Sequence, residues 1–169
     1  MPTPARERFA QLVGNPNDDF DLAEAALLIA QDAQPEMDIA AYLDRLDRLA
    51  SLVQNRLPGT PEAPTIVDQL NQLLFQEEKL SGNVTDYYDP RNSFLNEVLD
   101  RKTGIPITLS VIYMEVGRRL GLPLVGVGFP GHFLVKYTGP TGEVVLDPFH
   151  GGVRLSHEQL AQKLREMYG

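Results

Sequence analysis

The stretch from Gly104 to Gly151 constrains the fold more than any other part of this 169-residue chain. It contains one apolar run at helical spacing, from Pro106 to Gly121, followed by three apolar runs of strand length separated by glycine and proline. Proline is favoured in the first turn of a helix and glycine directly after its last turn. One helix and a small antiparallel sheet are therefore predicted, with strands at 124–129, 133–137 and 143–147.

The residues before this stretch are predicted to be largely helical. Apolar side chains recur at helical spacing over 39–53 and 66–75, and the Pro- and Gly-rich segment 57–64 reads as a connector between the two helices. A capping-box pattern at Ser156 to Gln159 predicts a last helix. The expected fold class is α+β in a single domain, 1–169, with a helical part over 1–90 and a helix-and-sheet core over 91–169 that the last helix closes.

Composition and charge exclude several functional classes. The chain has no cysteine, which excludes disulfides, thiolate metal sites and a thiol nucleophile. Its net charge is −8, and no strong basic cluster is present, so no nucleic-acid partner is expected. The apolar runs are too short to span a membrane, and the first residues lack the pattern of a secretory signal. We therefore expect a cytoplasmic location and no membrane partner.

A hairpin is predicted to join the last two strands across 138–142. If Lys136 lies opposite Glu143 as a charge pair, His132 lies opposite Asp147. The Cβ atoms of directly opposed residues are about 5 Å apart, so the imidazole can donate to the carboxylate. A histidine held by an aspartate supplies the base and its orienting group in a nucleophilic triad. A register slip of one residue would break the pairing.

Short motifs in the second half of the chain resemble a known family. The motifs are Gly104-Ile105-Pro106, Gly121-Leu122-Pro123, Gly131-His132-Phe133-Leu134-Val135 and Leu146-Asp147-Pro148. In order and spacing they resemble the transglutaminase-like core of the papain-like fold. With Asn92-Ser93-Phe94-Leu95 and Asp147-Pro148-Phe149-His150-Gly151-Gly152 they look like the bacterial SirB-type family over roughly 92–164. Members typically couple this domain to tetratricopeptide repeats, so such repeats are expected to accompany it.

This resemblance implies roles for individual residues. His132 and Asp147 fall on the histidine and aspartate of the family's triad. Counting back from Gly121, Pro106 stands where the superfamily has cysteine, and proline offers no nucleophile. We therefore expect a transglutaminase-like domain that has lost its nucleophile and serves as a non-catalytic module for binding or scaffolding a protein or peptide. The cleft expected to hold that partner is lined by Asn92, Pro106, Ser110, His132 and Asp147.

The competing class is an enzyme. Ser110 lies one helical turn after Pro106, so it is a tentative nucleophile for a serine-dependent amidase or acyl transferase with His132 as base and Asp147 as orienting group. Substrate-assisted chemistry through His132 is a variant of this hypothesis. Against both stands the usual behaviour of a mid-helix serine, which bonds the carbonyl oxygen four residues back.

Three further interpretations stay open. His132 can be a buried structural histidine that simply bonds Asp147. His132, Asp147 and His150 are residue types that bind metals, but His150 precedes two glycines, where a turn is expected, so no metal and no other cofactor is predicted. Lastly, the acidic helical half, around Asp44 and Asp47, can be a partner-binding surface, although a solvated charged face is the simpler interpretation.

Overall fold

The structure, a computed structural model, describes residues 1–14, 20–140 and 142–168. Aspartates begin two of the N-terminal helices: Asp21 accepts from the backbone N of Glu24 at 2.8 Å, and Asp38 accepts from that of Ala40 at 3.0 Å. The helical elements of this half are α1 (Pro4–Val13), α2 (Leu22–Ala33), α3 (Ile39–Gln54), α4 (Ala63–Asn71), the π-helix η1 (Gln72–Glu77), the 3-10 helix η2 (Pro90–Ser93) and α5 (Leu95–Arg101).

The second half contains one long helix and a sheet of four strands. Its elements are α6 (Pro106–Arg119), β3 (Leu124–Phe129), β4 (His132–Gly139), β5 (Gly142–Asp147), the 3-10 helix η3 (Pro148–His150), β6 (Val153–Leu155) and α7 (His157–Tyr168). The strands pair antiparallel in the order β3-β4-β5-β6. A separate pair, β1 (Ser81–Gly82) and β2 (Thr103–Gly104), is parallel. The predicted α+β class with a small antiparallel sheet is confirmed.

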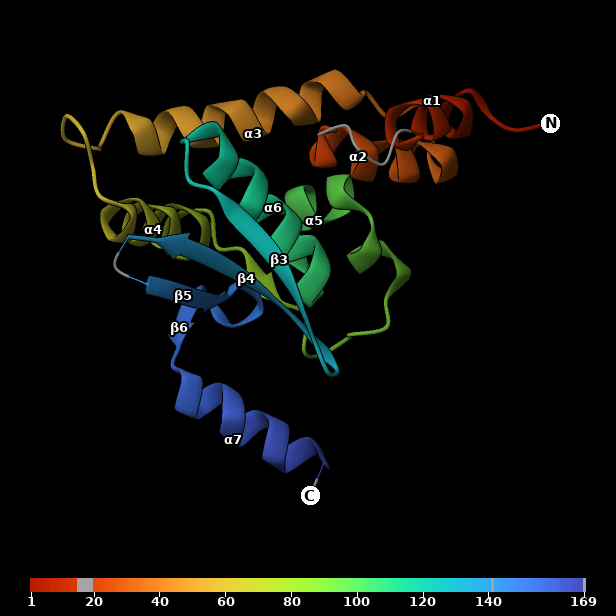
Figure 1. Ribbon diagram of the computed structural model, residues 1–169. Coiled ribbons are helices and arrows are strands. Elements are labelled where there is room, and N and C mark those ends of the chain that lie inside the picture. Colours follow the sequence, from red (N-terminus) through yellow and green to blue (C-terminus); the bar gives the residue numbers. More distant parts are fainter. Residues whose placement is uncertain (15–19, 141, 169) are drawn as a thin grey trace.

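Helix α6 lies at the centre of the molecule (Figure 1). It contacts β3 and β4 of the sheet as well as α2, α3, α4 and α5. Its residues Ile112, Tyr113 and Val116 have no exposed surface, and they pack in one core with Val135 of β4 and Leu146 of β5. The helix therefore joins the helical half to the sheet, as expected for the element that follows Pro106.

The strand register differs from the predicted one. Lys136 pairs with Val145, and Thr138 pairs with Glu143, so the ladder is shifted by two residues from the Lys136–Glu143 pairing. The shift arises because the strands extend to Gly139 and Gly142 and shorten the loop, of which Thr141 lies outside the described residues. The ammonium of Lys136 still reaches Glu143 at 2.7 Å. A shift of two residues leaves every side chain on the same face.

Asp89 caps the short helix η2, and α5 begins after Phe94. Two local features differ from the sequence analysis. Helix α4 already begins at Ala63, inside the predicted connector, because a proline at 64 suits its first turn. Strand β6 was not predicted, and it is only three residues long.

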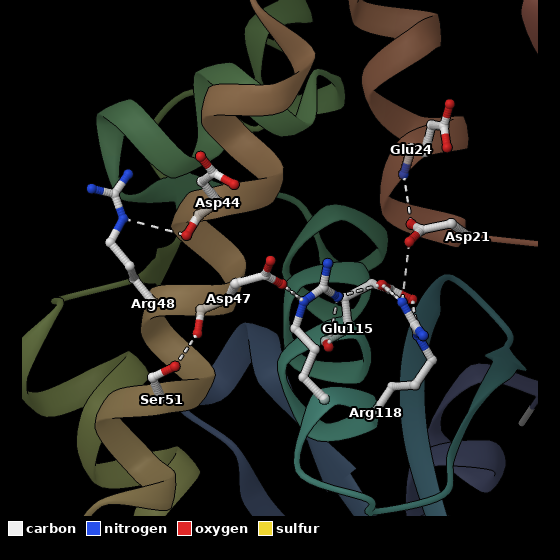
Figure 2. A network of polar contacts seen from close by, with 9 residues as sticks. Asp21, Glu24, Asp44, Asp47, Arg48, Ser51, Glu115 and Arg118 are labelled. Atoms are coloured by element: carbon white, nitrogen blue, oxygen red, sulfur yellow. Dashed lines mark hydrogen bonds and ion pairs between the residues drawn. The ribbon is translucent and has the colours of Figure 1, made fainter.

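Ion pairs tie α6 to the helices that cover it (Figure 2). Glu115, only 3% exposed, accepts from Arg118 at 2.9 Å and from Arg119 at 2.8 Å. Arg118 also reaches Asp21 at the start of α2, and Arg119 reaches Asp47 on α3. Asp47 is therefore part of a tether between helices, whereas the sequence interpretation placed it on a solvated face.

Helix α7 projects from the end of the sheet (Figure 1), and none of its described residues belongs to the core, so it does not close the core as predicted. Its predicted capping box is confirmed, since Ser156 Oγ accepts from the backbone N of Gln159 at 3.2 Å and Gln159 Oε1 accepts from that of Ser156 at 2.8 Å. Leu164 and Tyr168 are exposed on it. Within the described ranges, no helix combines the length and the apolar character that crossing a membrane requires.

The substitution Glu115→Gln is expected to lower the free energy of unfolding by about 2 kcal/mol, because it removes the buried carboxylate charge that pairs with Arg119, whose side chain is only 14% exposed. Asp68→Asn is the matched control: it removes an ion pair with Arg154 whose side chains are 65% and 48% exposed, and should cost less than about 1 kcal/mol. Urea denaturation measures both. Equal losses for the two variants would contradict the role given to Glu115.

Candidate functional site

The predicted contact between His132 and Asp147 is present. His132 is the first residue of β4, directly after Gly131, whose φ of +65° turns the chain out of β3. Its Nε2 lies 2.9 Å from both carboxylate oxygens of Asp147, the last residue of β5. Asp147 is 1% exposed and the side chain of His132 is 16% exposed. The carboxylate is thus enclosed, and the imidazole lies at the surface edge of the site.

A second imidazole, that of His150, contacts the same carboxylate. Its Nδ1 lies 2.8 Å from Asp147 Oδ2, and its backbone N donates to Oδ1 at 3.3 Å. Asp147 caps the 3-10 helix η3 and His150 ends it. Side chains three residues apart eclipse in a 3-10 helix, which brings these two together. In the sequence, the spacing Asp-Pro-x-His indicated this contact, because proline in the first turn favours a short helix rather than an open turn.

The two imidazoles set the charge state of Asp147. Burial raises the pKa of its carboxyl, but the hydrogen bonds from His132 and His150 outweigh burial and hold that pKa below its ordinary value. The group therefore stays ionised at neutral pH. Because Nε2 of His132 faces the carboxylate, Nδ1 is the nitrogen left for any further contact of this imidazole.

Aromatic rings extend from this cluster across the surface. Ring centroids are 5.8 Å apart for His132 and Phe149, 6.1 Å for Phe149 and Tyr87, and 5.4 Å for Tyr87 and Tyr88. Tyr88 is 91% exposed. We call these four residues and His150 the aromatic strip. Aromatic side chains such as tyrosine are enriched at protein-binding surfaces.

A cavity of about 290 Å³ adjoins His132. It separates the turn between β3 and β4 from α7, and it is lined by Phe129, Pro130, Gly131, His132, His150, Lys163 and Glu166. Of the five residues predicted to line a cleft, this cavity contacts His132. The hollow therefore lies on the side of the imidazole that faces α7.

Asn92 and Pro106, also predicted for the cleft, are buried. Asn92 Nδ2 donates to the backbone O of Asp86 at 2.8 Å and of Tyr87 at 3.1 Å, and Asn92 Oδ1 accepts from Asn83 at 3.1 Å. Its side chain thereby fixes the loop that carries the tyrosines of the aromatic strip. Pro106 begins α6, as predicted.

Ser110 is fully buried, and its Oγ has no hydrogen-bond partner among the described residues. It therefore bonds neither the carbonyl oxygen four residues back nor the imidazole of His132. The neighbouring Thr108 does find a partner, because its Oγ1 donates to the backbone O of Asn92 at 2.8 Å. The structure thus brings together His132 and Asp147 of the tentative triad, without a hydrogen bond from Ser110.

The loop that carries the tyrosines is anchored by Asp89. Its carboxylate accepts from Arg91 at 2.7 Å and from Arg101 at 3.0 Å, and it also caps η2 through the backbone N of Arg91 at 2.9 Å. The hydrogen bonds from Arg91, helped by the charge of Arg101, lower the pKa of Asp89 to about 2. The folded state therefore strongly favours the ionised form.

A comparison with protein families identifies the family of this chain. The family model described as "Transglutaminase-like superfamily" matches residues 40–169. The chain belongs to the transglutaminase-like superfamily. The match includes α3, α4 and α5, so this transglutaminase-like region extends well before the motifs at 92–164 that carried the resemblance.

Curated relatives agree with this assignment. A "UPF0162 protein" from Xylella fastidiosa is 43% identical over 88% of this chain and 53% of its own length, and one from Vibrio cholerae is 32% identical over 83% and 54%. "F-box only protein 21" from Mus musculus is 42% identical over 50% of this chain and 13% of its own. The chain spans about half the length of the bacterial relatives. No solved structure matches it significantly.

The folded-state pKa of Asp89 predicts a pH effect on this transglutaminase-like domain. Since that pKa is depressed, the stabilisation is complete above the ordinary value of 3.8 and is lost as the pH falls toward 2. The stability difference between the wild type and Asp89→Asn should therefore be large at about pH 5 and shrink at about pH 2.5. Urea denaturation at both pH values measures it, with the exposed Asp44→Asn as control. A difference that does not change with pH would refute this account.

Proposed function

We propose that this transglutaminase-like domain lacks a nucleophile and binds a protein or peptide segment. One observation carries the proposal: His132 and Asp147 keep the contact of a histidine–aspartate pair, while α6 begins with Pro106 and the chain contains no cysteine. Acyl transfer through a thioester requires a thiolate, so it is not available to this chain. An oriented imidazole without a nucleophile still serves as a hydrogen-bonding group for a bound segment.

The aromatic strip and the cavity beside it supply the remaining support. Tyrosine gives a large contact area at a low cost in conformational entropy, and Tyr87 and Tyr88 lie on a loop that Asn92 and Asp89 anchor. The cavity next to His132 has room for a side chain of a partner. We infer that the bound segment runs along the strip and places one side chain in the cavity.

Two further parts complete the proposal. The SirB-type motifs suggest that tetratricopeptide repeats act together with this domain. We also propose that the domain acts in the cytoplasm. Neither part is needed for the binding experiment below.

The competing enzyme hypothesis is tested with a fluorophosphonate probe directed at serine nucleophiles. We expect no labelling, because Ser110 is fully buried and forms no hydrogen bond with His132. Ser110→Ala should leave the free energy of unfolding unchanged or raise it by up to about 1 kcal/mol, since it removes an unpaired buried hydroxyl. An active serine hydrolase in the same reaction is the control. Labelling abolished by both Ser110→Ala and His132→Ala would establish a serine nucleophile and refute the proposal.

The binding hypothesis is tested by selecting peptides from a displayed random library on the purified chain and measuring their affinities. Tyr88→Ala should weaken a selected peptide at least about ten-fold, as expected for a central aromatic contact. Leu52→Ala is the matched control, because Leu52 is also an exposed apolar side chain, 44% exposed on α3. Equal affinities for wild type and Tyr88→Ala would contradict binding on the aromatic strip.

The same peptides distinguish the third interpretation, a partner on the acidic helical half. Asp44→Lys is the suitable charge reversal. Asp47 is not, because its ion pair with Arg119 tethers α3 to α6 and its loss would disturb the fold. Loss of binding in Asp44→Lys but not in Tyr88→Ala would place the partner on the helical half.

A further inference from the structure

We propose that His132, Asp147 and His150 form a binding site for a divalent transition-metal ion such as Zn²⁺. One ligand atom from each residue lies within 4.8 Å of the other two. The inference goes beyond the proposed peptide binding and does not depend on it. It also differs from the sequence analysis, which predicted no metal because the position of His150 indicated a turn.

Two of the distances between ligand atoms are somewhat shorter than those of a tetrahedral zinc site. Zn²⁺ binds imidazole nitrogen and carboxylate oxygen at about 2.0–2.2 Å, which places neighbouring ligand atoms about 3.3 Å apart. Here His132 Nε2 lies 2.9 Å and His150 Nδ1 lies 2.8 Å from Asp147 Oδ2. To admit the ion, each nitrogen must move about 0.5 Å away from the carboxylate oxygen.

The nitrogens that would bind the ion are the two that now face the carboxylate, Nε2 of His132 and Nδ1 of His150. A neutral imidazole carries its hydrogen on one nitrogen and a lone pair on the other. Metal binding therefore selects the tautomer of each ring that has its lone pair on the nitrogen facing Asp147.

The three ligand residues lie at the ends of two strands and a short helix. His132 begins β4, Asp147 ends β5, and His150 ends the single turn of η3, after which Gly151 turns the chain with a φ of +75°. Two histidines and one carboxylate are a ligand set that Zn²⁺, Co²⁺ and Ni²⁺ accept. The net charge of −8 further favours a cation.

The cavity of about 290 Å³ beside His132 and His150 leaves the fourth coordination position open. Glu166 lines this cavity on α7, and its Oε1 accepts from Gln162 at 2.9 Å. Lys163 lines the same space. The fourth position is therefore available to water, to Glu166 or to a group on a bound segment.

The chain provides a well-matched control for testing this site. It contains three histidines, and His157 is exposed on α7 outside the cluster. Zn²⁺ is titrated by calorimetry into protein that carries no histidine tag and has been treated with chelator. We expect one equivalent to bind to the wild type and to His157→Ala with affinities within about two-fold, and His150→Ala to weaken binding at least about ten-fold.

His150→Ala is the informative variant because His150 is more than half exposed and is not part of the core. Asp147→Asn should weaken binding as well. The visible absorption of bound Co²⁺ gives a second readout, since four-coordinate Co²⁺ absorbs far more strongly than the hydrated ion. Absence of saturable Zn²⁺ binding, equal affinity in wild type and His150→Ala, or loss in His157→Ala would each overturn the proposal, while leaving peptide selection on the aromatic strip unaffected.

Discussion

The burial of α6 on both sides is the constraint on which the rest of the structure depends. A helix enclosed by other helices and by a sheet must find partners for its polar groups inside the protein. The hydroxyl of Tyr113 donates to Asn71 Oδ1 at 3.0 Å, and Asn71 Nδ2 donates to the backbone O of Gly152 at 3.0 Å. A Cβ at position 152 would lie 2.0 Å from Asn71 Oδ1, so glycine is required there. Through this chain of contacts α6 fixes the turn that follows His150.

Features set by neighbouring residues were predictable from the sequence. Asp38 caps α3, Ser156 and Gln159 form a capping box, and Pro106 begins α6, because each depends on geometry within one helical turn. Strand register was not predictable to the residue, since it depends on loop length and on packing across the sheet. The predicted contact between His132 and Asp147 is present although the predicted strand register is wrong by two residues, because side chains two residues apart in a strand lie on the same face.

Contacts between segments that are distant in the chain could not be predicted from the sequence. The charges of α3 look alike in the sequence, yet Asp44 is exposed, Asp47 bonds Arg119, and Arg45 bonds Asp100 at 2.8 Å. The difference depends on which residues of α3 face α5 and α6, and helix packing decides that. Ser110 is a second example. Its spacing placed it one turn after Pro106, but it is buried in the core, and its hydroxyl has no hydrogen-bond partner in the part of the chain that the structure describes.

The cluster around Asp147 is hard to explain by stability alone. Taking a carboxylate out of water is costly, and a well-packed apolar group at such a position is often as stable or more so. Here the two imidazoles offset the cost, yet the side chain of one of them, His150, is more than half exposed. An ionised group enclosed at 1% exposure, with two rings directed at it and an open cavity beside them, is better explained by a ligand than by folding. A bound cation or segment adds the contacts that the cluster lacks, which is why the two proposals concern neighbouring parts of one surface.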